Sequence, residues 1–299
     1  MNERIDRRKF LRRGVLLAAV AGAASARFAV AASGDARRVA RSTASSAPAA
    51  SALPPVDAAL RQAFAPSGTL RVSINVGNPL LAASAPATGR LSGISVDLAR
   101  ELARRLDLPL EMITVNNAPH SVDAVTQDRA DIGFFALAHA SGAIRFTRPY
   151  LLLLANYLVR RDAPFQQPGD VDRPGVRVVV AQGSAYDLYL GDTLRHAELI
   201  RVKGEAAVIA AFLADPSAVA AGIGTQLAAE ARALDNVRLL DAPFTYIQQA
   251  LGIGARHDAG AAAWLNAFVD AMLRDGFIDA AVTRHRLTGV VVPAASSVP

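Results

Sequence analysis

Residues 70–76 read Leu-Arg-Val-Ser-Ile-Asn-Val, a stretch in which apolar and polar side chains alternate. Alternation with a period of two predicts a β-strand that is buried on one face. The turn-forming residues Gly-Asn-Pro at 77–79 end the strand, and residues 95–106 then carry apolar side chains at the spacing of one helical face. Ser95 is expected to cap this helix at its N-terminus. A strand followed by a helix is the repeating unit of α/β folds.

The same alternation of strand and helix continues along the chain. Before Pro164 we expect strands at 110–115 and 130–137, a short helix at 121–127 and an apolar run at 150–159. The pattern restarts after Pro164, with strands at 176–180, 197–202, 218–223 and 237–240 and helices at 184–194, 205–213 and 226–234. An extended run at 244–253 and helices at 259–274 and 277–287 complete the chain. Two sets of alternating elements predict parallel sheets covered by helices on both faces.

Residues 1–31 have the layout of an export signal. A basic stretch at 6–13, Asp-Arg-Arg-Lys-Phe-Leu-Arg-Arg, precedes small and apolar residues at 14–26. The paired arginines before Phe-Leu resemble the twin-arginine motif that directs folded proteins out of the bacterial cytoplasm. The apolar run of about 13 residues is too short for a bilayer, which requires about 20. We therefore expect an exported, soluble, periplasmic protein. The alternative is a basic N-terminus beside an Ala-rich helix.

The charge of the chain belongs largely to this leader. The sequence has 32 basic and 26 acidic residues, of which seven and two lie in residues 1–31, so the remainder has 25 and 24. A net charge of +1 gives no support for nucleic-acid binding. The sequence contains no cysteine, which excludes disulfides, thiolate metal sites, a cysteine nucleophile and a lipid anchor on cysteine.

Two segments at the ends of the remaining chain are predicted to be unstructured. Residues 32–67 are rich in Ala, Ser and Pro, which is typical of a flexible linker, with a short helix near 57–64. Residues 291–299 are predicted to be a disordered tail. About 230 residues then remain for the folded part, enough for one large or two small domains.

Four segments in a fixed order resemble the signature of periplasmic solute-binding proteins of family 3, the polar amino-acid receptors of ATP-driven importers. They are Leu-Arg-Val at 70–72 with Gly-Arg-Leu-Ser-Gly-Ile-Ser-Val-Asp-Leu-Ala at 89–99, Asp-Arg-Ala-Asp-Ile at 128–132, Phe-Thr-Arg-Pro-Tyr at 146–150, and Gly-Val-Arg-Val-Val-Val-Ala-Gln-Gly-Ser at 175–184. The resemblance covers residues 68–288.

This resemblance implies a two-lobed periplasmic-binding-protein-like (type II) α/β fold. Each lobe is a mostly parallel sheet flanked by helices, and two hinge crossovers near 159–163 and 241–248 join the lobes. Lobe 1 would comprise residues 68–160 and 247–290, and lobe 2 residues 163–243. The implied function is to capture a small-molecule solute between the lobes by hinge closure and deliver it to an ABC permease at the inner membrane. We expect a monomer that has no cofactor or metal and is not an enzyme.

The implied ligand-binding residues lie at strand ends and crossovers. Gly183 and Ser184 join a strand to a helix, where free N–H groups favour an anion, although Ser184 followed by Asp187 also fits an ordinary helix cap. Asn78 is either a ligand contact or a turn residue before Pro79. The full set is Asn78, Phe135, Ala136, Gly183, Ser184, Ala185, Tyr186, Thr225, Tyr246 and Gln248.

The sequence departs from the family where the α-amino acid would be held. Ala140 occupies the place of the arginine that binds the ligand's α-carboxylate, while Arg145 and Arg148 lie at positions that the family exposes. Gly222 or Gly224 occupies the place of the aspartate that binds the α-ammonium. Losing both groups argues against a standard α-amino acid as ligand. His139 is either a cleft contact or a loop residue.

Three functions remain open at this point. The first is capture of a small polar or carboxylated solute for import. The second is an enzyme on the same scaffold that resembles cyclohexadienyl dehydratase, which needs a cleft acid beside basic anchors. The third is a transport-inactive sensory or scaffold homologue. Glu205 and Asp187 are expected at solvated helix positions, Trp264 in the core, and the five histidines show no metal-binding spacing.

Overall fold

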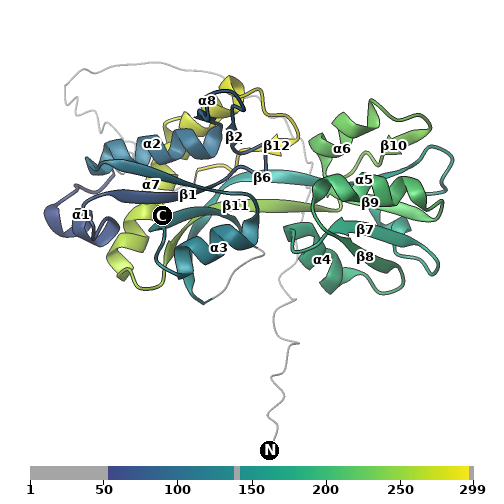
Figure 1. Ribbon diagram of the computed structural model, residues 1–299, viewed down its shortest axis with the longest axis horizontal. Coiled ribbons are helices and arrows are strands. Elements are labelled where there is room, and N and C mark those ends of the chain that lie inside the picture. Colours follow the sequence, from purple (N-terminus) through teal and green to yellow (C-terminus); the bar gives the residue numbers. More distant parts are fainter. Residues whose placement is uncertain (1–52, 138–141, 296–299) are drawn as a thin grey trace, which may run out of the picture. The chain divides into compact units, whose positions relative to one another are not determined.

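The computed structural model describes residues 53–137 and 142–295, which form α-helices around a ten-stranded mixed sheet (Figure 1). The expected export signal and residues 32–52 of the expected linker lie outside the described residues. The order of the main path is β4 (Leu110–Val115), β1 (Leu70–Asn75), β5 (Ile132–Ala136), β11 (Thr245–Gly254), β6 (Ile144–Arg160), β9 (Ala218–Ile223), β7 (Arg177–Ala181) and β8 (Glu198–Val202).

Each half of this sheet is parallel, and the strands that join the halves are antiparallel. In lobe 1, β1 pairs in parallel with β4 and β5, and in lobe 2, β7 pairs in parallel with β8 and β9. Between them β11 and β6 run antiparallel to their neighbours. Two short strands, β10 (Val237–Leu239) and β12 (Val290–Val291), pair with β6 as well. The predicted two-lobed α/β fold with mostly parallel sheets is confirmed.

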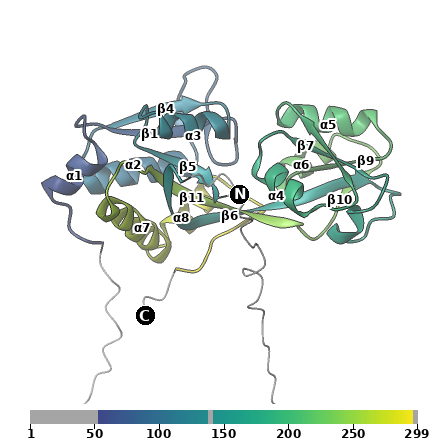
Figure 2. The ribbon, with the colours of Figure 1, turned by 90° about the horizontal axis from the view of Figure 1, so that it is seen from below.

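Helices cover both faces of the lobe 1 sheet (Figure 2). Consecutive side chains of a strand point to opposite faces, so Phe134 and Phe135 of β5 enter different cores. Phe134 belongs to the main core, to which α2 (Ile94–Leu106), α7 (Ala259–Arg274) and α8 (Phe277–Arg284) contribute. Phe135 packs in a smaller core beneath α3 (Ala118–Thr126). Trp264 is buried, as expected.

Lobe 2 has three helices, α4 (Ala185–Thr193), α5 (Glu205–Ala214) and α6 (Gly224–Ala231). The strand–helix order that the sequence predicted holds throughout this lobe, and most helix and strand ends agree within a few residues. A 3₁₀-helix, Pro168–Val171, precedes β7. A small hairpin of β2 (Ala83–Ser84) and β3 (Leu91–Ser92) in lobe 1 was not predicted.

The helix α2 is capped differently from the expectation. It begins at Ile94 with Gly93 as its N-cap, and Ser95 is buried inside the first turn. Gly93 has φ +121°, and a Cβ atom there would come within 2.3 Å of the Leu81 carbonyl oxygen. Only glycine tolerates both conditions. Close packing on the preceding loop therefore determines where the helix starts.

The first crossover begins earlier than the predicted 159–163. Ala155 of β6 pairs both with Thr245 of β11 and with Ile223 of β9, so residues 155–160 already run beside lobe 2 strands. Asn156, which interrupts the apolar run, is buried and donates to the Leu240 carbonyl at 3.1 Å. The chain returns where the Phe244 N–H donates to the Ala155 carbonyl at 2.8 Å. The junction therefore lies at Ala155 and Thr245.

The expected flexible linker is too long at its C-terminal end. Helix α1 (Ala58–Phe64), capped by Asp57, is the short helix that the sequence indicated. Its Phe64 is fully buried, with its ring 5.6 Å from that of Trp264 on α7, and the Trp264 indole donates to the Pro54 carbonyl at 3.0 Å. Residues from Pro54 onward are therefore part of the folded body.

The expected disordered tail also begins too early. Val290 and Val291 of β12 pair with Leu153 and Leu152 of β6, next to the junction of the lobes. Further along, the Arg148 guanidinium donates to the Ala294 carbonyl at 2.7 Å. The chain is thus anchored at least to Ala294.

Candidate functional site

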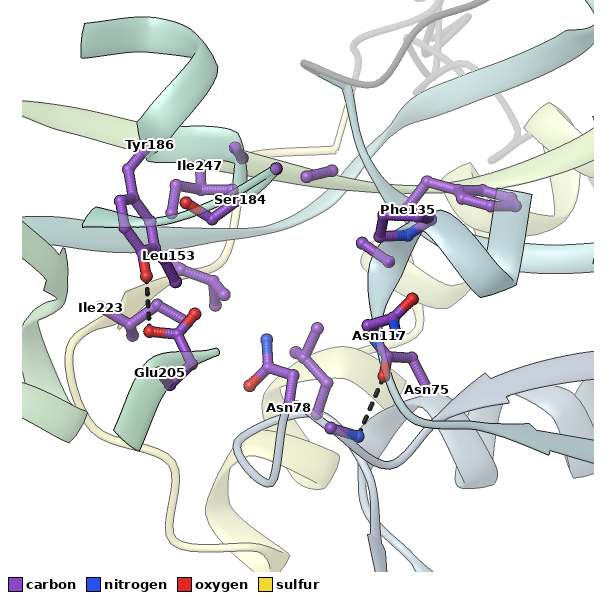
Figure 3. Close-up of a pocket in the computed structure, with 18 of the residues that line it drawn as sticks. Asn75, Asn78, Asn117, Phe135, Leu153, Ser184, Tyr186, Glu205, Ile223 and Ile247 are labelled. Carbon is purple, nitrogen blue, oxygen red and sulfur yellow. Dashed lines mark hydrogen bonds between the residues drawn. The ribbon is translucent and has the colours of Figure 1, made fainter. Parts of the chain in front are cut away.

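A cavity of about 260 Å³ lies between residues of the two lobes, beside the junction. The lobe 1 wall carries four asparagine side chains: Asn75, Asn78, Asn116 and Asn117. The lobe 2 wall is built from residues 181–186 at the start of α4 and from Glu205 at the start of α5. Leu153 and Ile247, on the two strands that join the lobes, provide apolar surface between the walls (Figure 3).

Seven of the ten predicted site residues line this cavity: Asn78, Phe135, Ala136, Gly183, Ser184, Ala185 and Tyr186. They come from three separate segments, at 78, 135–136 and 183–186, and the fold brings them to one place. Their contact with a ligand stays a prediction.

Tyr246 and Gln248 do not line the cavity. Both lie on β11, where alternate side chains face opposite sides, and the cavity takes Ile247 and Gln249 instead. Tyr246 is 51% exposed. The predicted residues thus lie on a strand that borders the cavity, but on its other face.

Thr225 also lies outside the cavity lining. It sits in the first turn of α6, and its hydroxyl is buried with no hydrogen-bond partner among the described residues. The next residue, Gln226, faces the cavity and donates to Asn78 Oδ1 at 3.4 Å, a hydrogen bond between the lobes. Neighbouring side chains of a helix point in different directions, so only one of these two faces the cavity. The sequence alone did not show which one.

Phe135 contributes to the cavity wall without presenting its ring. Figure 3 shows the ring pointing away from the open space, and the side chain is buried beneath α3. There it packs onto two glycines, since a Cβ atom on Gly133 or Gly252 would come within 2.5 or 2.8 Å of ring carbons. The ring therefore fixes the end of β5 that borders the cavity.

Replacing Gly252 by alanine is expected to lower the free energy of unfolding by about 1–3 kcal/mol, because the added methyl group overpacks this core. Urea unfolding followed by circular dichroism measures the change. Gly169→Ala is the control, since its Cβ atom would meet nothing within 4 Å. Equal stability of the two variants would contradict the packing of Phe135 on Gly252.

The start of α4 is a fully formed helix cap. Ser184 Oγ accepts from the Asp187 N–H at 3.1 Å, and the Asp187 carboxylate accepts from the Gly183 N–H at 2.9 Å and from Arg201 Nε at 2.8 Å. Asp187 is buried, so the expectation that it is a solvated acid is wrong. The Asp187 carboxylate already accepts from the Gly183 N–H, the group that the sequence suggested for binding an anionic ligand. A second anion at this place would meet like charge.

Glu205 is the charged group of the cavity. Among the described residues that line it, no other has a charged side chain. Tyr186 Oη donates to Glu205 Oε2 at 2.5 Å, and the other carboxylate oxygen faces the open space (Figure 3). Burial raises the pKa of Glu205, against the lowering effect of the Tyr186 hydrogen bond. Glu205 is an exposed residue, so solvent screens much of this increase. It is solvated, as expected of an acid at the start of a helix, but it is not isolated, because it bonds to Tyr186 and lines the cavity.

The asparagines of lobe 1 have a defined orientation. Three of the four side-chain oxygens accept from backbone N–H groups: Asn75 from Gly77 at 2.9 Å, Asn78 from Leu80 at 3.2 Å and Asn117 from His120 at 2.8 Å. A backbone N–H can bond only to the amide oxygen, so each NH₂ group is left on the other side. Figure 3 shows the Asn78 nitrogen pointing into the open space. This wall therefore offers hydrogen-bond donors.

The groups that would hold an α-amino acid are absent from the described cavity lining. Arg145 donates to the His257 carbonyl, and Arg148 forms an ion pair with Asp270 at 2.6 Å, so both arginines serve the structure. On the opposite side, Gly222 faces Leu227. Ala140 and His139 lie outside the described residues.

Two searches of the described residues gave negative results. No group of three or more His, Asp or Glu residues is arranged to bind a metal ion. Within the same residues, no helix has both the length and the apolar character to span a bilayer.

Comparison with known proteins identifies the family. Residues 70–287 match the profile of the bacterial extracellular solute-binding proteins, family 3. The match spans most of the sequence, and the chain belongs to this family. No curated protein is similar enough in sequence to match it.

Solved structures share the fold at low sequence identity. A putative ABC-transporter binding component from Wolinella succinogenes, complexed with lysine, is 21% identical with a TM-score of 0.61 over 73% of this chain and 95% of that chain. The ancestral amino-acid-binding protein AncCDT-1, a precursor of cyclohexadienyl dehydratase, is 20% identical with a TM-score of 0.61 over 75% and 97%. The periplasmic VFT2 domain of Bordetella pertussis BvgS is 17% identical with a TM-score of 0.62 over 78% and 100%.

Proposed function

We propose that this protein is the periplasmic substrate-binding component of an ABC importer. It captures a small polar solute in the cavity between its lobes and delivers it to a permease at the inner membrane. Membership of the family supports a substrate-binding role. Two proteins of similar structure are described as complexed with lysine and bound to L-arginine. The observation that carries the proposal is the cavity, which is lined by polar groups of both lobes beside the strands that join them.

Hinge closure explains how such a cavity would hold its solute. The two walls contribute different groups, amides from lobe 1 and the α4 and α5 starts from lobe 2. A solute that touches both walls stabilises the arrangement in which they face each other. The Gln226–Asn78 hydrogen bond is a direct contact between the walls.

A thermal-unfolding screen of the purified protein against amino acids, organic acids, amines and prephenate tests this function. A solute at about 100 times its Kd is expected to add about 2.7 kcal/mol to the stability. Small-angle X-ray scattering would then show a smaller radius of gyration with the bound solute. If no solute from this screen or from a mixed metabolite extract binds, the proposal is wrong and a transport-inactive homologue is favoured.

One observation favours an enzyme as the second candidate. Glu205 is an acid with a raised pKa beside Tyr186 in the cavity, a suitable arrangement for general-acid catalysis. The basic anchors that a cyclohexadienyl-dehydratase-like enzyme needs are not among the described lining residues. Consumption of prephenate or arogenate would support this candidate, and binding of a solute without turnover would support the first.

A further inference from the structure

The described lining of the cavity carries charge of one sign only, and that charge is negative. It contains the Glu205 carboxylate and no arginine or lysine. Among the described residues, the Glu205 side chain bonds to the neutral Tyr186 hydroxyl and forms no ion pair. Glu205 is exposed, so a solute can reach its carboxylate, and a cation is the partner that stabilises this charge.

The opposite wall has complementary chemistry. The side-chain oxygens of Asn75, Asn78 and Asn117 accept from backbone N–H groups, so these three residues have NH₂ donors left for a ligand. Neutral donors suit hydroxyl, carbonyl or amide oxygens. They lack the positive charge that makes a bidentate bond to a carboxylate strong.

We propose that the cavity selects a small organic cation, with an ammonium or guanidinium group at Glu205 and an uncharged oxygen or nitrogen group at the lobe 1 amides. This inference rests on the proposed solute-binding function and narrows its substrate class. Glu205 is the specificity-determining residue, and Tyr186 is a positioning residue that orients its carboxylate. A carboxylate on the solute has no charged partner in the described lining and weakens binding.

A matched series of solutes tests whether the cavity prefers cations to carboxylates. Isothermal titration calorimetry would compare 6-aminohexanamide, L-lysinamide, L-lysine, 6-aminohexanoate and hexanoate, which share a carbon chain and differ in their end groups. The two amides, which combine a cation with an uncharged carbonyl group, are expected to bind most tightly, L-lysine and 6-aminohexanoate more weakly, and hexanoate not at all. Tightest binding of L-lysine or of hexanoate would overturn the proposal.

Two variants test the role of Glu205. Glu205→Gln keeps the shape of the side chain and an acceptor for Tyr186, and it is expected to weaken 6-aminohexanamide binding about tenfold or more. Glu230→Gln removes the same charge from an exposed position on α6 outside the cavity lining and should leave the affinity unchanged. Equal affinities of the two variants would overturn the assignment to Glu205. Unchanged circular dichroism of both variants verifies their folding.

The affinity for 6-aminohexanamide should also depend on pH with a defined sign. The cation requires ionised Glu205, whose pKa is raised by burial, so the affinity falls on acidification at a higher pH than an ordinary glutamate would give. Tyr186, the one titratable group among the described residues that bonds to Glu205, stays protonated because burial and Glu205 raise its pKa. The affinity of Glu205→Gln should not fall over this range. A decline of the same size in the variant would contradict the proposal.

The experiments separate this inference from the function on which it rests. If no compound of the amine series binds but native mass spectrometry detects another solute bound from a metabolite extract, the preference for cations is wrong and the proposed binding function is kept. If no solute from the extract binds either, the proposed binding function is wrong.

Discussion

Replacing Asp131 by asparagine is expected to lower the free energy of unfolding by about 3 kcal/mol or more, because it removes the charge of a fully buried carboxylate that two arginines share. The Asp131 side chain is 0% exposed. It accepts from Arg71 at its backbone N–H (2.9 Å), Nε (3.1 Å) and NH2 (2.7 Å), and from Arg256 at 2.8 Å. These bonds join β1 to the loop after β11 across the start of β5.

A neighbouring acid provides the matched control. Asp128 also pairs with Arg256, but its side chain is 60% exposed, and Asn tolerates its positive φ of +57°. Asp128→Asn should therefore cost less than about 1 kcal/mol, as exposed ion pairs do. Urea unfolding of both variants measures the difference. Equal losses would show that the buried network of Asp131 is not a specific source of stability.

Replacing Phe64 by alanine is expected to cost about 3–5 kcal/mol, the usual effect of deleting a large aromatic side chain from a core. Phe64 is 0% exposed and meets Trp264 edge to face. Trp264 is the only tryptophan, so its emission reports directly on the docking of α1. The same variant should shift this emission to longer wavelength, since water then reaches the indole.

Gln62→Ala is the control for this experiment. Gln62 is an exposed residue of the same helix, and its substitution should change the stability by less than about 0.5 kcal/mol and leave the emission unchanged. If Phe64→Ala matched this control, α1 would behave as the flexible linker that its composition suggests.

Much of the fold could be predicted because its elements have clear periodicity. The helix expected at 259–274 has those bounds in the structure, and the lobe 2 strands alternate with helices as expected. The segment around α1 was misjudged because seven residues are too short to show that Phe64 enters a core. The junction at Ala155 was misplaced because β6 is mostly buried, so its hydrophobicity does not change where it passes from one lobe to the other.

The sequence predicted the part of the candidate site whose location follows from the end of a strand and the start of a helix. Gly183 and Ser184 end a strand and begin a helix, and this geometry brings them to the cavity. Glu205 was missed because an acid in the first turn of a helix is usually solvated. Its partner Tyr186 lies 19 positions earlier, and only the packing of α4 against α5 brings the two together. The sequence did not show which face of β11 borders the cavity, because Thr-Tyr-Ile-Gln-Gln at 245–249 has polar side chains on both faces; in the structure Ile247 and Gln249 are buried, whereas Tyr246 and Gln248 are exposed.

One strand, β6, passes through the junction without interruption, paired with β11 up to Ala155 and with β9 and β10 beyond it. Rotating one lobe against the other must therefore twist β6 at this point, and the strands bonded to it resist the twist. This deformation offsets part of the attraction between a solute and the two walls. The stiffness of β6 at Ala155 thus influences how tightly a solute is held and how quickly it dissociates, independently of the groups that touch it.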